Sequence, residues 1–266
     1  MTISLITVCY QSVDVIRTAI ESVLRQTWLD IEYLVVDGGS TDGTVDVIRE
    51  YEPKFYGRMK WISEHDCGMY DAINKGIRMA TGEVVGILNA DDALATDGVL
   101  EEIAKAFSRA AHAVLDAVYG DIRFVSDKKS ITLDELKQEK TIRYYSSKYF
   151  HSGLARFGYL PAHPSFFCKR MLFDKLGKYL TDYKIASDHE LMIRFFVKGG
   201  IRYQYMADVF TVMRVGGMST RSLENTMIMN RENIRACRAN GIYTNWLMQL
   251  GKYLFKIPGL VFRTGY

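Results

Sequence analysis

The chain has few of the residues on which disulfide-rich and metal-cluster proteins depend. Its 266 residues include four cysteines, which are widely scattered and form no C-x-x-C pair: Cys9, Cys67, Cys168 and Cys237. This spacing argues against a zinc site or a disulfide framework and is compatible with a reducing cytoplasm. Internal repeats, low-complexity tracts and Pro/Ser-rich linkers are also missing from the sequence. We therefore expect one continuous domain with a C-terminal appendage.

A large surplus of charge and long apolar runs are absent as well. The formal net charge of +3 is too small to argue for a nucleic-acid partner. No uninterrupted apolar stretch is long enough to span a bilayer, and Met1 leads directly into a strand-like run without a secretory signal. With 48% hydrophobic and 24% charged residues, the composition is that of an ordinary folded protein. These features predict a cytoplasmic protein, either free in solution or peripheral on a membrane.

The sequence does contain a regular alternation of short strands and helices in its first half. Apolar runs of strand length are present at 3–10, 31–36, 60–63, 84–88 and 117–125. Helical spacing of apolar residues is present at 13–26, 45–51, 69–80 and 99–107. This alternation predicts an α/β fold with a mostly parallel central sheet flanked by helices. Ligands of such sheets bind beyond the carboxyl ends of the strands.

The second half of the chain is less regular. Residues 127–130 suit a hairpin turn, and residues 188–198 show the pattern of an amphipathic helix. Residues 144–158 are rich in aromatic side chains and glycine and give no clear assignment. The sequence therefore predicts the structure of this half only in part.

An acidic pair follows the central strand. The apolar run at 84–88 stops at Asn89-Ala90-Asp91-Asp92. Adjacent carboxylates at the mouth of a buried strand repel each other and lose hydration. A hard divalent cation, Mg2+ or Mn2+, resolves both problems and would carry a phosphate-bearing ligand. The alternative is a strand-to-helix turn, in which one Asp caps the helix that begins near Gly98. Two consecutive carboxylates fit this alternative less well than one, so we favour a metal.

The loop at 37–44 follows a strand and opens a helix, a setting in which backbone N–H groups can meet phosphate. It lacks G-x-G-x-x-G spacing and a Walker lysine, which excludes a dinucleotide fingerprint and a P-loop. It offers two carboxylates instead, Asp37 and Asp42, which suit neutral donors such as ribose hydroxyls or a uracil N–H. The alternative is that both serve the conformation of the turn, and for Asp42 alone this explanation is equally good.

A second loop-to-helix junction lies at 64–76. Asp66 precedes the expected helix and suits a purely structural role as its cap. Asp71, Asn74 and Lys75 fall one helical turn apart, so they face either one cleft or solvent.

Together these segments resemble the family 2 glycosyltransferases, which have the glycosyltransferase A fold. The dense part of the likeness lies in about the first 125 residues and consists of Ile6-Thr7-Val8-Cys9-Tyr10, 36–44, Asp66-Cys67-Gly68, 71–76, and Thr81-Gly82-Glu83 through Asp92. A thinner part continues through His163-Pro164-Ser165-Phe166-Phe167, Ser187-Asp188-His189-Glu190-Leu191 and Gly216-Gly217-Met218-Ser219. The resemblance is specific because four motifs occur in the right order.

The resemblance implies a set of donor-site residues. Asp37 and Asp42 would hold the nucleoside of a sugar nucleotide, and Asp66 would contact its base. Asp91 would reach the ribose. The metal, Mn2+ or Mg2+, would lie on Asp92 and bridge both phosphates. Two further nucleotide contacts complete the set: Thr7 and Tyr10.

The resemblance also implies a catalytic base. Asp188 matches the second residue of the family's Glu-Asp pair, and Ser187 replaces the Glu, so Glu190 is the obvious substitute. Inverting transfer needs a carboxylate to deprotonate the acceptor hydroxyl on one face of the sugar and a Lewis acid for the diphosphate that leaves on the other. The alternative is that Asp188 is only the N-cap of its helix. His163 is either a third metal ligand, an acceptor contact or a core histidine, and Arg194 either holds a diphosphate or covers apolar surface.

We therefore predict an inverting, metal-dependent glycosyltransferase of bacterial cell-envelope polysaccharide synthesis. It would take a nucleotide-diphosphate sugar, in the first place a UDP-sugar, and extend a glycan or polyprenol-linked acceptor. The expected parts are a nucleotide-sugar half (1–125), an acceptor and catalytic-base half of the same domain (126–220) and a C-terminal helical segment (221–266). The alternatives are a nucleotidyltransferase or phosphohydrolase, and a catalytically silent module that binds a sugar nucleotide or glycan.

The C-terminal segment has a distinctive composition. From Asn233 to Tyr266 there is no acidic residue, and five basic residues interleave with aromatic and aliphatic ones: Arg235, Arg238, Lys252, Lys256 and Arg263. This pattern favours an amphipathic element in the membrane interface, at the inner face of the cytoplasmic membrane. Packing on the domain, or on a second subunit in a homodimer, fits the pattern equally well.

Overall fold

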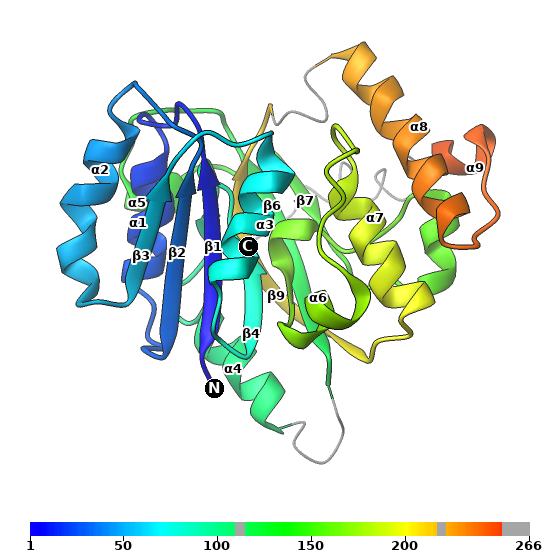
Figure 1. Ribbon diagram of the computed structural model, residues 1–266, viewed down its shortest axis with the longest axis horizontal. Helices are drawn as coiled ribbons and strands as arrows, with labels where there is room; N and C mark the ends of the chain where they lie inside the picture. Colours follow the sequence, from blue (N-terminus) through cyan, green and yellow to red (C-terminus); the bar gives the residue numbers. More distant parts are fainter. Residues whose placement is uncertain (110–114, 217–221, 252–266) are drawn as a thin grey trace.

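The computed structural model describes residues 1–109, 115–216 and 222–251. Four parallel strands of the first half lie in the order β3-β2-β1-β4: β1 (Ile3–Cys9), β2 (Ile31–Asp37), β3 (Met59–Ser63) and β4 (Val84–Ile87). All residues of β1, β2 and β4 are buried, as expected for parallel strands that helices cover on both faces. Figure 1 shows the carboxyl ends of these strands at one edge of the sheet.

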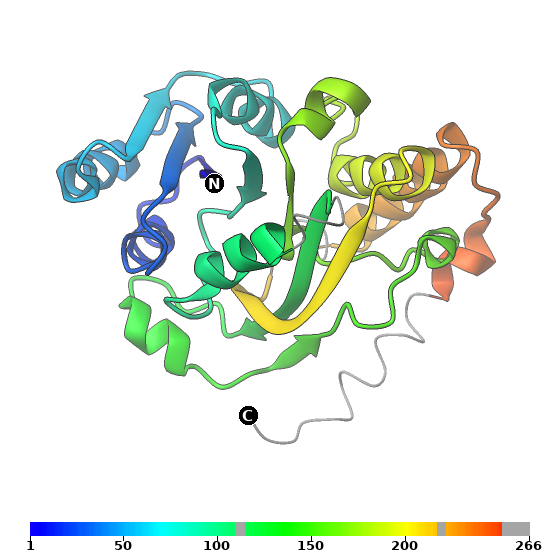
Figure 2. The same ribbon diagram turned by 90° about the horizontal axis from the view of Figure 1, so that it is seen from below.

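The second half extends the same sheet with mixed pairing. β4 pairs antiparallel with β8 (Phe166–Lys169), which pairs antiparallel with β6 (Ala117–Val125). β6 pairs in parallel with the long strand β9 (Tyr203–Arg214), drawn in yellow in Figure 2, and antiparallel with β7 (Arg143–Tyr145). The short strand β5 (Ala93–Leu94) pairs antiparallel with β9. Because β5 directly follows the acidic pair, the end of β9 lies beside the carboxyl end of β4.

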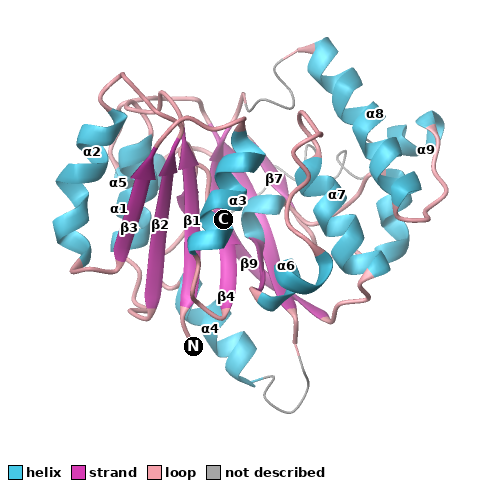
Figure 3. Cartoon of the chain, viewed as in Figure 1, coloured by secondary structure: helices cyan, strands magenta, loops and turns pink. Residues whose placement is uncertain are grey.

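Helices cover both faces of the sheet (Figure 3). The first half contributes α1 (Ile16–Leu24), α2 (Thr44–Tyr51), α3 (Met69–Met79) and α4 (Val99–Arg109). The second half contributes α5 (Leu133–Gln138), α6 (Met171–Leu176), α7 (Ser187–Ile193), α8 (Leu223–Ala239) and α9 (Trp246–Leu250). Shorter helical turns are η1 (Glu52–Phe55), η3 (Ser152–Phe157), η4 (His163–Ser165) and the π-helical η5 (Arg194–Lys198). On one face of the sheet the core contains side chains of α3, α6 and α7. On the other face it contains side chains of α1 and α4.

Strand β1 separates these two cores. Ile6 and Val8 point into the core under α3, whereas Ile3 and Leu5 point into the opposite core, because successive side chains of a strand alternate between its faces. Helix α3 lies unusually close to the strand, since a Cβ added at Gly76 would lie 2.5 Å from Ile6 Cγ2. The loop that precedes α3 lies near the carboxyl end of β1, since Asp66 and Tyr10 both lie next to Gly38.

The predicted α/β fold, with its central sheet flanked by helices and its helical C-terminal appendage, is confirmed. The strands and helices expected in the first half are present, with ends that shift by a few residues. The hairpin turn expected at 127–130 is wrong, because the chain passes through α5 before it returns as β7. Helix α5 forms because Leu133 packs with Val125 in a small core, and because Thr132 and Glu135 make a capping box.

The C-terminal appendage packs on the domain as far as Gly251. The Thr244 hydroxyl and the Gln249 amide both donate hydrogen bonds to the Arg156 carbonyl, at 2.6 and 3.1 Å. No helix within 1–109, 115–216 and 222–251 is long and apolar enough to cross a membrane. The prediction of an interfacial element extends to residues 252–266, which lie outside the described residues.

Candidate active site

The Asp37 carboxylate is fully buried at the end of β2, where it holds the loop that follows. Its oxygens accept hydrogen bonds from the Gly39 and Ser40 N–H groups (3.1 and 2.9 Å) and from the Ser40 and Ser63 hydroxyls (2.5 and 2.7 Å). Burial alone would raise the pKa of Asp37, but these hydrogen bonds outweigh it and lower the pKa below its ordinary value. The carboxylate is therefore ionised and organises the loop around it.

Asp42 links the same loop to the start of α1 and α2. One carboxylate oxygen accepts from the Val13 N–H at 3.0 Å, and the other accepts from the Thr44 N–H at 3.0 Å and hydroxyl at 2.6 Å. Burial raises the pKa of Asp42, and these hydrogen bonds more than reverse that effect. The conformational role considered for Asp42 is thus present in the structure, and its contact with a nucleoside stays a prediction.

Tyr10, Gly38 and Asp66 come together at the carboxyl ends of β1, β2 and β3. A Cβ added at Gly38 would lie 2.8 Å from Asp66 Oδ2 and 3.3 Å from Tyr10 Cδ2, so both side chains flank the glycine. Tyr10 is 64% exposed, and Asp66 Oδ1 accepts from the Gly68 N–H at 2.9 Å, just before α3. An exposed aromatic ring beside a carboxylate suits a planar base that carries an N–H donor. Thr7 is fully buried in β1, and its hydroxyl accepts a hydrogen bond from Tyr33.

The acidic pair lies one strand away, after β4. Asp91 is partly exposed, whereas Asp92 is fully buried and accepts a hydrogen bond from the Asn89 amide at 2.7 Å through Oδ2. Within the described residues, Asp92 Oδ1 has no hydrogen-bond partner. Burial, followed by the negative charge of Asp91, raises the pKa of Asp92 well above its ordinary value. Burial also raises the pKa of Asp91.

Arg214 also belongs to this corner, although the sequence did not predict it. It comes from the end of β9, is 2% exposed, and donates to the Asp91 backbone carbonyl, to the Thr18 hydroxyl (3.3 Å) and to the Lys128 carbonyl (2.9 Å). Burial lowers the pKa of Arg214, while the charges of Asp91 and Asp92 favour its protonated form. Its position two residues before the Gly216-Gly217 motif was the available signal, although residues 217–219 lie outside the described part of the chain.

The acidic pair fits a hard divalent cation by its chemistry. Asp91 and Asp92 supply carboxylate oxygens, the ligand type that Mg2+ and Mn2+ prefer, and Asp92 Oδ1 is available. The described residues contain no group of three or more His, Cys, Asp or Glu side chains that could hold a metal. A cation here would therefore need phosphate oxygens or water to complete its coordination, which is usual for Mg2+ in nucleotide sites.

Asp188 lies in the first turn of α7 and is partly buried. Its Oδ1 accepts from the His189 N–H at 2.8 Å and lies 3.4 Å from the Tyr70 hydroxyl, which donates to the Ile185 carbonyl. Burial, with the charge of Asp188, raises the pKa of Tyr70 far above its ordinary value, so Tyr70 stays protonated. The N-cap of α7 is Ala186, so the alternative that Asp188 is the N-cap is wrong.

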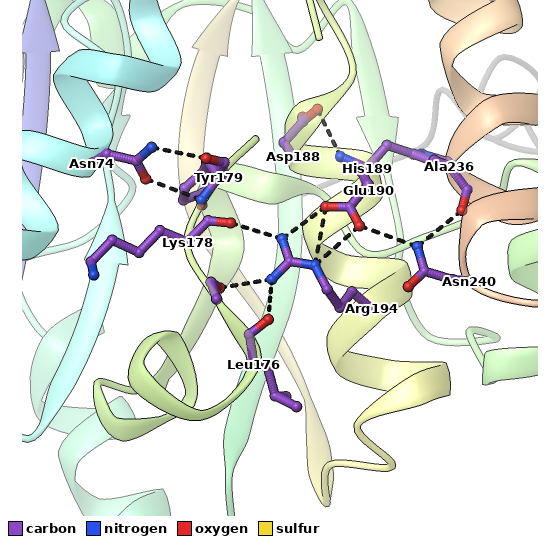
Figure 4. A network of polar contacts seen from close by, with 11 residues as sticks. Asn74, Leu176, Lys178, Tyr179, Asp188, His189, Glu190, Arg194, Ala236 and Asn240 are labelled. Carbon is purple, nitrogen blue, oxygen red and sulfur yellow. Dashed lines mark hydrogen bonds and ion pairs between the residues drawn. The ribbon is translucent and has the colours of Figure 1, made fainter. Parts of the chain in front are cut away.

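Glu190 belongs to a buried polar network that joins α7, α8 and the segment after α6 (Figure 4). It is 3% exposed, receives the Arg194 guanidinium at 2.8 Å, and accepts from the Asn240 amide at 3.1 Å. Arg194 also donates to three carbonyls, those of Leu176, Gly177 and Lys178. These contacts give both side chains structural partners. A role for Glu190 as the base, or for Arg194 in binding a diphosphate, stays a prediction.

His163 has a core partner. Its Nε2 lies 2.6 Å from the Tyr179 hydroxyl, and burial lowers the pKa of the imidazole, which favours a neutral ring. The Asn74 amide exchanges two hydrogen bonds with the Tyr179 backbone (2.8 and 3.0 Å), while Lys75 pairs with Glu64 at 2.9 Å. Of the three α3 residues that would face either one cleft or solvent, Asn74 and Lys75 therefore bind different neighbours.

A cavity of about 360 Å3 lies between the start of α3 and the loop before α7. Its lining consists of Cys67, Gly68, Met69, Tyr70, Asp71, Thr181, Asp182, Tyr183 and Lys184. Tyr70 lines this cavity and also contacts Asp188, which places the cavity next to the candidate base.

Comparison with known families identifies the family of the chain. Residues 4–180 match the family model described as glycosyl transferase family 2. The chain belongs to this family. It is 29% identical over 219 residues to a PGL/p-HBAD biosynthesis glycosyltransferase of Mycobacterium bovis, which covers 80% of this chain and 77% of that protein. It is 30% identical over 194 residues to an uncharacterized glycosyltransferase of Mycobacterium tuberculosis, with 73% and 68% covered.

Solved structures of glycosyltransferases share the fold. S. aureus TarS 1-349 in complex with UDP-GlcNAc superposes with a TM-score of 0.66 at 16% identity, covering 99% of this chain and 72% of that one. A mannosyltransferase from Pyrobaculum calidifontis, in complex with GDP-Man and Mn2+, gives a TM-score of 0.58 at 19% identity, with 97% and 79% covered. The longer TarS chain is covered over 40% of its length. These similarities confirm the glycosyltransferase A fold.

Proposed function

We propose that this family 2 glycosyltransferase moves a sugar from a UDP-sugar to an acceptor hydroxyl with inversion, and that it requires a divalent cation. The observation that carries the proposal is the buried Oδ1 of Asp92, which has no hydrogen-bond partner among the described residues and lies beside Asp91 after β4. Asp92 would hold Mn2+ or Mg2+, which would supply a Lewis acid for the departing nucleoside diphosphate. The Mn2+ and GDP-Man of the Pyrobaculum mannosyltransferase structure support a metal in this fold.

The nucleoside would rest on the surface formed by Tyr10, Gly38 and Asp66. The Tyr10 ring stacks on the base, the Asp66 carboxylate accepts its N–H, and Asp91 reaches the ribose. Asp37 and Asp42 contribute by fixing the loop beneath the nucleoside, since their oxygens already bind protein donors. Thr7 supports the same edge from inside β1.

The proton of the acceptor would go to Asp188. As the acceptor oxygen forms its bond to the anomeric carbon, Asp188 takes the hydroxyl proton, and the bond from that carbon to the diphosphate oxygen breaks on the opposite face. The leaving group keeps the electron pair of the broken bond, and Asp188 ends protonated. The His189 N–H, which donates to Asp188 Oδ1 at 2.8 Å, orients the carboxylate for this step.

Calorimetry with UDP, with and without Mn2+, together with a turnover assay tests the proposal. We expect Mn2+-dependent UDP binding, and release of UDP from one of the donors UDP-glucose, UDP-GlcNAc or UDP-galactose. A first thermal-shift screen of UDP-, GDP- and dTDP-sugars with Mn2+ selects the donor, because a ligand of the folded state raises Tm. Binding without turnover of any sugar nucleotide would favour a silent binding module, and preference for GDP- or dTDP-sugars would overturn the UDP assignment.

We further propose that the C-terminal segment attaches the enzyme to the inner face of the cytoplasmic membrane, where it would meet a polyprenol-linked acceptor of cell-envelope polysaccharide synthesis. Apolar side chains of α8, α9 and the turn between them are exposed to solvent: Leu223, Met227, Tyr243, Trp246, Leu247 and Leu250. Basic residues follow in the sequence at 252, 256 and 263. Flotation with phosphatidylglycerol vesicles should retain the full chain and lose the variant Leu247→Glu. Equal flotation of both proteins would count against this attachment.

A further inference from the structure

Helix α7 carries Asp188 in its first turn, yet no side chain of its own caps its N-terminus. The N-cap position is Ala186, which has no side-chain acceptor. The first N–H groups of a helix have no partner within the helix, so a helix start on a buried loop needs an acceptor from elsewhere.

Glu232 of α8 supplies an acceptor for the N-cap N–H and for the two N–H groups before it. Its Oε1 accepts from the Lys184 N–H at 2.6 Å, and its Oε2 accepts from the Ile185 and Ala186 N–H groups, both at 2.9 Å. Three consecutive backbone N–H groups thus converge on one carboxylate, and such hydrogen bonds to an ionised acceptor are stronger than neutral ones. The three residues immediately precede Ser187 and the candidate base.

A second contact from α8 holds the same loop a few residues earlier. Arg235 donates to the Asp182 backbone carbonyl at 3.2 Å and to its carboxylate, and its guanidinium lies 4.3 Å from the centre of the Tyr183 ring. Glu232 and Arg235 are three residues apart and therefore lie on one face of α8. The loop 182–186 is consequently attached to this helix over its whole length.

The loop also controls the other partner of the base. Tyr70, whose hydroxyl lies 3.4 Å from Asp188 Oδ1, donates to the carbonyl of Ile185. The N–H of this same Ile185 binds Glu232. A displacement of the loop would therefore move Asp188 and change its contact with Tyr70 together.

We propose that Glu232 is a positioning residue for the transfer reaction: it holds residues 184–186 so that the Asp188 carboxylate meets the acceptor hydroxyl. This inference rests on the proposed role of Asp188 as the base. It gives α8, which lies outside the region 4–180 that matches the family model, a part in building the site.

Three variants test the role of Glu232. Glu232→Gln keeps the size of the side chain but places an amide N–H2 against backbone N–H groups, and Glu232→Asp keeps the charge with a shorter reach. Glu224→Gln is the matched control, because Glu224 is exposed in the first turn of the same helix. Amide hydrogen exchange of residues 184–188 reports the cap directly, UDP affinity with Mn2+ reports the donor site, and UDP release from the donor selected by the wild type reports kcat.

In Glu232→Gln we expect faster exchange at 184–186 and an unchanged UDP affinity. We expect kcat to fall about 10- to 100-fold, because a misplacement of about 1 Å can cost about 100-fold. Glu232→Asp should recover part of kcat, and Glu224→Gln should behave as the wild type. If Glu232→Gln does not fold, the comparison of Glu232→Asp with Glu224→Gln carries the same test with a smaller loss.

Two results would overturn the inference. The first is a wild-type kcat in Glu232→Gln despite faster exchange at 184–186. The second is a loss of UDP affinity as large as the loss of kcat, since this would indicate a general disturbance. Asp188→Asn, measured in parallel, distinguishes a failure of the proposed base from a failure of the proposed role of Glu232. If Asp188→Asn keeps turnover, the proposed base is wrong, whereas an inactive Asp188→Asn with a fully active Glu232→Gln removes only the role of Glu232.

Discussion

The contacts of Arg194 with Glu190 and with the carbonyls of residues 176–178 form a clamp between α7 and the segment after α6. Replacing Arg194 with methionine would remove this clamp. The Arg194 side chain is 11% exposed and its guanidinium pairs with Glu190, which is 3% exposed. It also donates to three carbonyls: those of Leu176, Gly177 and Lys178. Methionine fills a similar volume without charge, so the Arg194→Met variant would keep the Glu190 carboxylate buried beside a neutral partner, the Asn240 amide.

The expected loss of stability is large. Breaking a buried ion pair by removing one partner costs about 3–5 kcal/mol, because the other charge stays buried without compensation. In a chain of this size about 1 kcal/mol lowers Tm by about 2–4 °C, so Tm should fall by about 6–20 °C. The double variant Glu190→Leu/Arg194→Met removes both charges and should therefore recover most of the stability that Arg194→Met loses.

Urea denaturation and thermal unfolding of the single and double variants measure this coupling. Lys198→Met is the control, because Lys198 is an exposed cation at the end of η5 and should change stability by less than about 0.5 kcal/mol. Turnover is compared at a temperature at which every variant is folded. A loss below about 1 kcal/mol in Arg194→Met would refute the clamp. A Glu190→Gln variant with unchanged Tm but abolished turnover would refute the structural role of Glu190 and would indicate a catalytic role instead.

Three further substitutions test other parts of the site and the sheet. Gly38→Ala adds a Cβ 2.8 Å from Asp66 Oδ2, so UDP affinity by calorimetry should fall about tenfold. Gly98→Ala is the control, because its Cβ would meet no atom of the described residues within 4 Å, and it should bind UDP normally. Asp92→Asn replaces a buried carboxylate, whose pKa is raised, with a neutral group of the same size, so Tm without metal should not fall. Mn2+-dependent UDP binding and turnover should both be lost. Near-normal turnover would count against the metal site. Burial disfavours the ionised form of Glu32, but hydrogen bonds, led by that of the Thr81 N–H, lower its pKa from 4.5 to about 2. Its contribution to stability is therefore complete above pH 4.5 and disappears as the pH falls through about 2, so Tm should fall more steeply over this window in the wild type than in Glu32→Gln.

The strands and helices around the site could be predicted because apolar periodicity is a local property of the sequence. The hydrogen-bond partners of the carboxylates are harder to predict from the sequence, although the sequence contains a pattern that indicates some of them. Asp37 binds Ser40, and Asp42 binds Thr44, at separations of three and two residues. An Asp followed shortly by Ser or Thr in a glycine-rich turn is typical of side-chain-to-backbone turns. This spacing could have indicated that both carboxylates organise their loop.

Other contacts join residues that are far apart in the sequence. Arg214 reaches the Asp91 carbonyl across 123 residues, and Glu232 reaches the Ala186 N–H across 46. These contacts depend on how β9 returns to the sheet edge and how α8 packs beside α7, which periodicity does not encode. The hairpin turn expected at 127–130 failed for the same reason, because the buried site of α5 beside β6 and β9 decides the path of the chain.

Asp92 differs from the other buried carboxylates of the described residues in one respect. Protein donors reach both oxygens of Glu32, Asp37, Asp121 and Glu190. Among the buried carboxylate oxygens of the described residues, Asp92 Oδ1 is the one without a hydrogen-bond partner. Arg214 lies close enough to bind the Asp91 carbonyl, but its hydrogens also go to Thr18 and to the Lys128 carbonyl. Burial of a carboxylate oxygen without a donor costs free energy that a bound cation would recover. Metal affinity at this corner should therefore depend on Asp92, and Asp37 and Asp42 should affect it only through the shape of their loop.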